Sequence, residues 1–340
     1  MGIEALTRNV EEIVTPQELE ALLRQRGPTA YWGFELSGEF HLGWFMCADK
    51  IKDIVQAGFD CTILLADWHA YINDKLGGDM DNIRRCGKYI KDCFSSLGVS
   101  SVRYVWASDM IQQKEYWERA IKIAKCLSLA RVKRSMTILG RQEREADVDF
   151  SKLLYPVMQV TDIFQLDVDM AAAGIDQRKA HMLARDVAEK LGWKKPVALH
   201  VPLLPGLGGG GRMEPGKMSK SRPETCVYIH DSPEEIHKKI GQAYCPPAPT
   251  TEKNPLLDLC RYVIFPHYKE VVIKRPSKHG GDVTVDEGQL VALYRDGGLH
   301  PADLKACIAE YLVDLLKPVR VYFDSHPENL RAMERMTVTR

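Results

Sequence analysis

The stretch AYWGFELSGEFHLGWFMCADKIKDIVQA, residues 30–57, decides the expected fold. It begins with a run of aromatic and apolar residues, which predicts a buried β-strand over residues 30–36. A strand that turns directly into a helix is the repeating unit of a parallel α/β sheet. Residues 42–57 predict such a helix, because apolar side chains recur at helical spacing at Phe45, Ala48, Ile51 and Ile54 or Val55.

The same alternation continues over the first two thirds of the chain. It predicts an α/β fold class, a Rossmann-like, doubly wound parallel sheet with a connective insertion at about residues 107–150. Further strands are predicted over residues 59–70, where the strand runs into a loop, and over residues 102–106, 166–174 and 199–204. Helices are predicted over residues 83–97, 116–142, 153–166 and 177–191.

The composition changes at residue 231, where a second domain is predicted to begin. Ser232 as the N-cap, Pro233 in the first helical position and Glu235 two residues later form a capping box that opens a helix. The last strong helix begins at Pro301 and keeps its apolar spacing to Val319. The predicted domains are therefore a catalytic domain, residues 1–230, and a mainly helical C-terminal domain, residues 231–340.

The composition also excludes several classes of protein. Its 46 basic and 46 acidic residues cancel, so only local charge patches bear on a nucleic-acid partner. No apolar run reaches the roughly 20 residues of a membrane span, and the N-terminus is too acidic for a secretory signal. We therefore expect a cytoplasmic protein without a membrane partner. The nine cysteines include no C-x-x-C pair, so we expect neither disulfides nor a metal site.

Two short motifs are suited to phosphate chemistry. His41 and Gly43 open a helix, whose N-terminal N–H groups, imidazole donor and small residue favour an anionic ligand. The loop at residues 208–222 ends in KMSKS, which supplies two ammonium groups and two hydroxyls to a triphosphate. Each motif alone has an ordinary explanation, as a capping histidine and as a solvated basic loop.

Together, HLGW after the first strand and KMSKS after the last resemble the class I aminoacyl-tRNA synthetases. The resemblance narrows to tyrosyl-tRNA synthetases of the archaeal and eukaryotic type, and it covers about residues 29–323. It implies activation of L-tyrosine with ATP and Mg²⁺ to tyrosyl-adenylate and pyrophosphate, followed by transfer to the 3′ end of tRNA(Tyr). The matching segments are Tyr31 in AYWGFELSG, YPVMQVTD at 155–162, GIDQRK at 174–179, IKRPSKHGGDVTV at 273–285 and HPADLK at 300–305.

The resemblance also implies which residues bind tyrosine. Tyr31 and Asp162 meet the phenolic hydroxyl, where the carboxylate accepts its proton. Tyr155, Gln159 and Gln177 hold the α-ammonium end. Gln159 and Asp162 are three residues apart, which places them on one face of a helix. Without the resemblance, the ordinary explanation is two packing tyrosines and a surface acid.

For ATP, the resemblance assigns the catalytic donors to the two phosphate motifs. The tyrosine carboxylate is already ionised, so positioning and charge stabilisation by His41, Gly43, Lys217 and Lys220 suffice. Asp176 accepts hydrogen bonds from the ribose, and the glycines let the nucleotide approach. Trp44 departs from the class, in which histidine is commonest at this position. The implied ATP-binding residues are Gly33, His41, Gly43, Asp176, Lys217, Met218, Ser219, Lys220 and Ser221.

The tRNA contacts are likewise implied by the resemblance. Arg134, Arg178 and Lys179 bind the first base pair of the acceptor stem, and Asp303 recognises the first anticodon base. His279 stands where the family has a phenylalanine that stacks on that base, and an imidazole stacks less strongly. Ordinary explanations are a solvated basic helix face and a helix start. The insertion commonly forms a homodimer interface in this family.

Three alternatives stay open from the sequence. A tryptophanyl-tRNA synthetase shares the fold, both phosphate motifs and part of the 155–162 block. A different nucleotidyltransferase uses H-x-G alone, although KMSKS and the helical C-terminal domain count against it. A catalytically silent tRNA-binding paralogue is disfavoured by the intact His41 and KMSKS.

Overall fold

The computed structural model describes residues 2–140, 149–208, 218, 223–246, 248–249, 251 and 254–336. The chain divides into two compact units, which are described separately. The first unit comprises Met1–Gly38, Cys47–Pro202 and Glu328–Arg340. The second comprises Glu39–Met46 and Leu203–Pro327. The sequence-based boundary at residue 230 stays a prediction.

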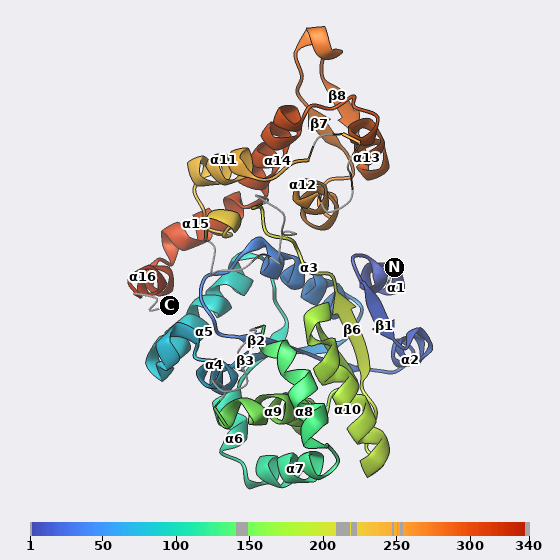
Figure 1. The fold of residues 1–340 in the computed structure, drawn as a ribbon, viewed down its shortest axis with the longest axis vertical. Helices are drawn as coiled ribbons and strands as arrows, with labels where there is room; N and C mark the ends of the chain where they lie inside the picture. The colour runs from blue at the N-terminus through green and yellow to red at the C-terminus, as the bar shows by residue number, and fades with distance from the viewer. Residues whose placement is uncertain are drawn as a thin grey trace. The chain divides into compact units, whose positions relative to one another are not determined.

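The first unit is built on a six-stranded sheet in the order β1-β6-β5-β2-β3-β4 (Figure 1). Neighbouring strands are parallel except at the edge, where β1 runs antiparallel to β6. The predicted α/β fold is confirmed, whereas the edge strand was not predicted because three residues are too few to show an alternation. The strands are β1 (Glu12–Val14), β2 (Thr29–Glu35), β3 (Asp60–Ala66), β4 (Val102–Trp106), β5 (Met170–Gly174) and β6 (Val197–Val201).

Helices cover this sheet and form the insertion. The single helix predicted over residues 116–142 is wrong, because Ser128 caps a new helix by accepting from the Arg131 N–H at 3.3 Å. Two helices therefore replace it, α7 (Lys114–Lys125) and α8 (Leu129–Ser135). The other helices are α1 (Gly2–Thr7), α2 (Pro16–Leu22), α3 (Leu42–Gln56), α4 (Asp67–Ile72), α5 (Met80–Ser96), α6 (Ala107–Ile111), α9 (Ser151–Gln165), α10 (Arg178–Leu191) and α16 (Glu328–Glu334).

The main core of the first unit joins the centre of the sheet to α9. Tyr31, Leu64 and Ala171 come from the adjacent strands β2, β3 and β5, and all three are buried in one apolar cluster. Val160 and Ile163 of α9 belong to the same cluster. The polar residues of α9 are thereby fixed against the middle of the sheet.

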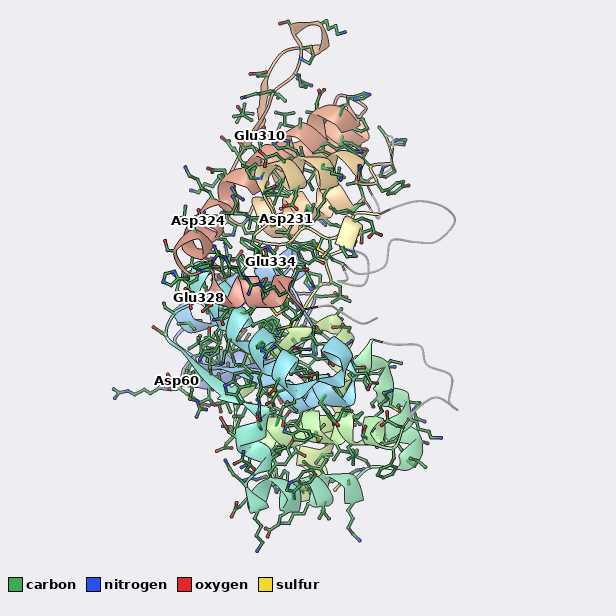
Figure 2. The ribbon with its side chains drawn as sticks, turned by 90° about the vertical axis from the view of Figure 1, so that its left-hand side faces the viewer. Asp60, Asp231, Glu310, Asp324, Glu328 and Glu334 are labelled. Carbon is green, nitrogen blue, oxygen red and sulfur yellow. The ribbon has the colours of Figure 1, made fainter. Side chains whose placement is uncertain are left out.

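The second unit is mainly helical, as predicted. Ser232 and Glu235 form the predicted capping box at the start of α11 (Pro233–Gln242), with reciprocal hydrogen bonds of 3.2 and 2.8 Å. Asp231, labelled in Figure 2, accepts from the Tyr228 N–H at 2.9 Å and pairs with Lys239 at 2.6 Å. The other elements are α12 (Pro255–Leu259), β7 (Val271–Ile273), β8 (Val283–Val285), α13 (Glu287–Arg295), α14 (Pro301–Leu315) and α15 (Lys317–Ser325).

The last predicted helix is shorter than expected. α14 ends at Leu315, and Val319 lies on α15, because Pro318 has no N–H to continue the hydrogen-bond ladder. Within the described ranges, no helix combines the length and the apolar character needed to cross a membrane.

Candidate active site

Two residues of the candidate tyrosine-binding site lie on β2. Tyr31 and Gly33 are two residues apart, so their Cα positions face the same side of the sheet. A Cβ atom on Gly33 would lie 3.3 Å from the Tyr31 hydroxyl, closer than ordinary contacts. The glycine thus leaves room for the Tyr31 ring. Burial raises the pKa of Tyr31, which keeps this phenol neutral.

Asp162 of α9 forms the polar end of the pocket and is 1% exposed. The Tyr116 hydroxyl donates to its Oδ1 at 2.8 Å, and His69 Nε2 lies 3.2 Å from its Oδ2. Burial raises the pKa of Asp162 to about 8 and lowers that of His69 to about 4. At neutral pH, both side chains are therefore mainly uncharged.

Tyr116 and His69 were missed by the sequence interpretation. His69 lies on α4, which follows β3 directly, so its place at the carboxyl edge of a parallel sheet could have indicated it. Tyr116 lies on α7 of the insertion, where no sequence signal distinguishes it from other core aromatics.

A second polar group lies where β2 ends, at Glu35. Tyr155 donates its hydroxyl to Glu35 Oε1 at 3.2 Å, and Asn73 Nδ2 donates to the same oxygen at 2.7 Å. Lys75 Nζ lies 3.5 Å from the other oxygen. Glu35 was also missed from the sequence. Its carboxylate is suited to bind an ammonium group beside Tyr155.

The two predicted glutamines are brought together by the fold. Gln159 Nε2 of α9 donates to Gln177 Oε1 at 3.3 Å. Gln177 Nε2 donates in turn to the Ile138 carbonyl at 3.0 Å. This chain links α9 to the segment before α10, which also carries Asp176.

Several buried polar atoms of the candidate site residues and their neighbours have no hydrogen-bond partner. They are both ring nitrogens of His69, Asn73 Oδ1, Gln159 Oε1 and Asp162 Oδ2. Buried polar atoms are normally paired, because leaving one unpaired costs about 1–3 kcal/mol. A ligand with N–H donors would pair with the two amide oxygens, and a hydroxyl group, which both donates and accepts, would pair with the carboxyl group of Asp162.

His41 and Gly43 lie in the second unit, and their geometry fixes one tautomer of the imidazole. The Gly43 N–H donates to His41 Nδ1 at 3.1 Å, so a neutral ring carries its proton on Nε2. A Cβ on Gly43 would lie 2.9 Å from the His41 ring, which excludes larger residues. Trp44 packs beside this ring, with centroids 5.7 Å apart.

The KMSKS motif falls mostly outside the described residues, which include only Met218. Lys217, Ser219, Lys220 and Ser221 are therefore not placed. Met218 is buried, and its N–H donates to the Leu204 carbonyl at 2.7 Å.

Within the second unit, the segment of His41 is hydrogen-bonded to the segment that follows KMSKS. His41 and Tyr228 form an isolated antiparallel bridge. Leu42 N–H donates to the Val227 carbonyl at 3.0 Å, a few residues after KMSKS. Leu204, the partner of Met218, lies 3.9 Å from the position of a Cβ on Gly43.

The predicted acceptor-stem residues lie together on exposed parts of the first unit. Lys179 Nζ donates to the Arg134 carbonyl at 3.1 Å and to Thr137 Oγ1 at 2.9 Å. Arg178 is adjacent in the chain and makes two hydrogen bonds to Glu12, at 2.7 and 2.8 Å. The fold thus places near one another the three cations that the resemblance assigned together to the acceptor stem.

The two predicted anticodon residues are connected through Arg275 of the second unit. His279 closes a turn whose side-chain placement lies outside the described residues, and Asp303 lies half-buried in the first turn of α14. Arg275 donates to the Gly281 carbonyl at 2.9 Å and to the Gly298 carbonyl at 2.8 Å. One guanidinium therefore ties the loop of His279 to the segment that leads into α14.

Comparison with known proteins identifies the family. A model of class I tRNA synthetases (W and Y) matches residues 23–317. A tyrosine–tRNA ligase of Picrophilus torridus is 49% identical over 323 residues, which cover 94% of this chain and 98% of the relative. A crystal structure of tyrosyl-tRNA synthetase from Aeropyrum pernix shares 45% identity with a TM-score of 0.88, and covers 98% of each chain. That of Pyrococcus horikoshii, complexed with L-tyrosine, shares 42% identity with a TM-score of 0.92, again over 98% of each chain.

A match over most of the chain to a class I model defines the class of protein. Within that class, the chain belongs to the archaeal-type tyrosyl-tRNA synthetases. The predicted class and family are confirmed, and ATP is a substrate of this class. The tryptophanyl alternative is weaker, because relatives that share nearly half of the residues are tyrosine–tRNA ligases.

The raised pKa of Asp162 predicts a proton-linked change in stability. Its pKa rises from 3.8 to about 8 on burial, so the folded protein holds one more proton than the unfolded chain in that window. This contribution to stability is complete below about pH 4 and is lost as the pH rises to about 8. Asp162→Asn should reduce the slope of the free energy of unfolding against pH, by at most about 1.4 kcal/mol per pH unit.

The measurement is the free energy of unfolding in urea between pH 5 and pH 8, for the wild type and Asp162→Asn. Asp109→Asn, which changes an exposed carboxylate on α6, serves as the control and should keep the wild-type slope. Equal slopes in the wild type and Asp162→Asn would contradict the assignment of a retained proton to Asp162.

Proposed function

We propose that this chain activates L-tyrosine with ATP to form tyrosyl-adenylate and transfers tyrosine to the 3′ end of tRNA(Tyr). The observation that carries the proposal is the buried carboxyl group of Asp162, which lies within 3.2 Å of Tyr116 and His69 and has one oxygen, Oδ2, without a hydrogen-bond partner. The family relationship supports it, because the similar proteins are tyrosine–tRNA ligases.

In this proposal, the pocket selects tyrosine by its hydroxyl. The phenol lies between Tyr31 and Asp162, and Tyr116 holds the carboxyl group of Asp162 by its 2.8 Å hydrogen bond. Phenylalanine leaves these buried groups unpaired. Tyrosyl-tRNA synthetases are themselves the standard case of rejection on this basis without editing.

The substrate's ammonium group is assigned to the other end of the pocket. Tyr155, Gln159 and Gln177 orient it, and Glu35 supplies the opposite charge. A charge-assisted hydrogen bond is stronger than a neutral one, so Glu35 contributes most to holding the ammonium. The substrate's carboxylate is then directed toward ATP.

In the activation step, a carboxylate oxygen of tyrosine forms a bond to the α-phosphorus while the bond to the bridging oxygen of pyrophosphate breaks. The nucleophile is already ionised, so no general base is required. His41 donates its Nε2 proton in a hydrogen bond to a phosphate oxygen, and Lys217 and Lys220 neutralise the departing pyrophosphate. Asp176 accepts from the ribose hydroxyls.

Mg²⁺ is assigned to the phosphates of ATP. Among the described residues, no three His, Cys, Asp or Glu side chains are grouped to hold a metal ion. Magnesium commonly binds mainly through substrate phosphates and water, and we assign it to ATP on that basis. When bound, it supplies positive charge to the triphosphate.

The tRNA contacts follow the same proposal. Arg134, Arg178 and Lys179 bind the acceptor end, and the mainly helical residues 231–340 bind the anticodon through Asp303 and His279. Because the product is consumed in translation, we assign the enzyme to the cytoplasm.

We also propose a homodimer formed through the insertion. Trp117 and Ile121 are one helical turn apart on α7 and are 42% and 65% exposed. Leu129 at the start of α8 is 61% exposed. Adjacent exposed apolar side chains of this kind mark protein interfaces.

The test of the function is ATP–pyrophosphate exchange measured with each of the twenty amino acids. We expect exchange with tyrosine, little with phenylalanine, and loss of roughly 10- to 100-fold in kcat/KM for Asp162→Ala, the effect of leaving buried hydroxyl groups without their hydrogen-bond partner. Exchange with tryptophan in place of tyrosine would establish the tryptophanyl alternative. Tight tRNA binding without any exchange would establish a silent paralogue.

Asp303→Ala should impair tRNA charging without affecting adenylate formation. We expect KM for tRNA to rise roughly 10-fold or more, because a carboxylate that accepts from a base is lost. The control is Glu310→Gln on the exposed side of the same helix, labelled in Figure 2. Equal losses in exchange and in charging would contradict the anticodon role.

Ile121→Glu should convert the dimer to a monomer, because a charge is costly in an apolar interface. Sedimentation equilibrium measures the mass of the wild type, Ile121→Glu and the neighbouring control Lys122→Glu. A monomeric wild type, or a dimer that tolerates Ile121→Glu, would show that the interface lies elsewhere or is absent.

A further inference from the structure

Four side chains of the first unit form a continuous chain that ends at a proposed tRNA contact. Arg178 donates through Nε and one terminal nitrogen to the two oxygens of Glu12, at 2.7 and 2.8 Å. Glu12 Oε2 lies 3.0 Å from His200 Nδ1. His200 Nε2 lies 3.0 Å from His181 Nδ1. This hydrogen-bonded row of side chains begins at the exposed guanidinium of Arg178 and ends at the buried imidazole of His181.

The fold holds each member of this chain in register. Glu12 on β1 is paired directly with His200 on β6 in the antiparallel ladder. Arg178 and His181 are three residues apart on α10, so they share one face of the helix. Figure 1 shows β1, β6 and α10 close to one another at this edge of the sheet.

The protonation states of Glu12, His200 and His181 determine which side chain donates each hydrogen bond and which accepts it. Burial lowers the pKa of His181 to about 3 and also lowers that of His200, so both imidazoles are neutral. The hydrogen bond from Arg178 lowers the pKa of Glu12, which is therefore a carboxylate. Since a carboxylate only accepts, His200 donates from Nδ1 to Glu12 and accepts at Nε2 from His181. Both histidine donors thus serve to hold Glu12.

We propose that Glu12 is a positioning residue that holds Arg178 for the acceptor stem of tRNA, with His200 and His181 fixing Glu12 from within the fold. The proposal rests on the proposed tRNA-binding role of Arg178. Glu12 occupies one edge of the guanidinium fork, and the other edge keeps its N–H donors for phosphate or base. A side chain ordered before binding loses less entropy when the complex forms.

The opposite interpretation is that Glu12 competes with tRNA for Arg178. If Glu12 competed with tRNA, it would have to release the guanidinium of Arg178 when tRNA binds. Because the fully buried His200 holds Glu12 in place, we favour the interpretation that Glu12 positions Arg178 for tRNA. The two interpretations predict opposite changes in KM for tRNA when Glu12 is neutralised, so kinetics distinguish them.

The experiment compares Glu12→Gln with the wild type in aminoacylation and in ATP–pyrophosphate exchange. For Glu12→Gln, we expect KM for tRNA to rise roughly 2- to 10-fold, because Arg178 would then lose its conformational freedom only when tRNA binds. We expect kcat and the rate of ATP–pyrophosphate exchange to stay unchanged. Glu12→Asp, which keeps the charge, should restore part of the loss. The double variant Glu12→Gln/Arg178→Ala should be no worse than Arg178→Ala alone, because Glu12 acts through Arg178.

The matched control is Glu18→Gln. Glu18 follows β1, on α2, and pairs at 2.9 Å with Arg185, which lies two turns beyond Arg178 on α10. This variant breaks a similar ion pair between the same regions, and we expect KM for tRNA to stay unchanged. An equal effect of Glu12→Gln and Glu18→Gln would overturn the proposal in favour of a general structural role.

Two further outcomes separate this inference from the function on which it rests. If Arg178→Ala raises KM for tRNA and Glu12→Gln leaves it unchanged or lowers it, only the positioning role is overturned. If Arg178→Ala itself has no effect on KM for tRNA, the proposed role of Arg178 fails, and the positioning role fails with it.

Discussion

The parallel pairing of β2 with β3 on one side and β5 on the other is the constraint on which the first unit depends. It places Tyr31, Gly33 and Glu35 at alternate positions toward the carboxyl edge of the sheet. α9 packs on the same strands through Val160 and Ile163, and this contact presents Asp162 to Tyr31. The polar pocket is therefore a product of apolar packing around it.

Burial of polar groups around Asp162 costs stability. His69 and Asp162 lie 3.2 Å apart, yet neither gains a hydrogen bond from the other. Proteins commonly break local packing rules at functional sites and are stabilised elsewhere. Here the apolar core beneath the pocket offsets the cost, and a ligand with matching donors recovers part of it.

The sequence predicts the parts of the fold that depend on local pattern. β2, β3 and α3 were found because their apolar residues recur at a clear period between turns, and the capping box at Ser232 marks α11 by itself. β1 was missed because Glu12, Ile13 and Val14 are too few to show a period. The break at Ser128 was missed because basic residues on both sides fit one helix as well as two.

The site was less accessible to sequence reasoning, since its residues have ordinary explanations one by one. Tyr31 and Asp162 were assigned by resemblance, and the structure adds their shared buried surroundings. Tyr116 and Glu35 gain their meaning only from tertiary placement, at 2.8 Å from Asp162 and 3.2 Å from Tyr155. A single polar residue that reaches the site from another element produces no periodic pattern in the sequence, so sequence reasoning cannot identify it.

Trp44 shows how a partial motif can keep its chemical core. The orientation of His41 is fixed by the Gly43 N–H and by the absence of a side chain on Gly43, and neither depends on the fourth residue. Trp44 packs against the ring of Phe40, with centroids 5.4 Å apart, and lies beside His41. A tryptophan here packs beside the imidazole of His41 and supplies an indole N–H in place of a second imidazole. The proposed binding of phosphate by this motif therefore rests on the imidazole of His41 and on the backbone at the start of α3.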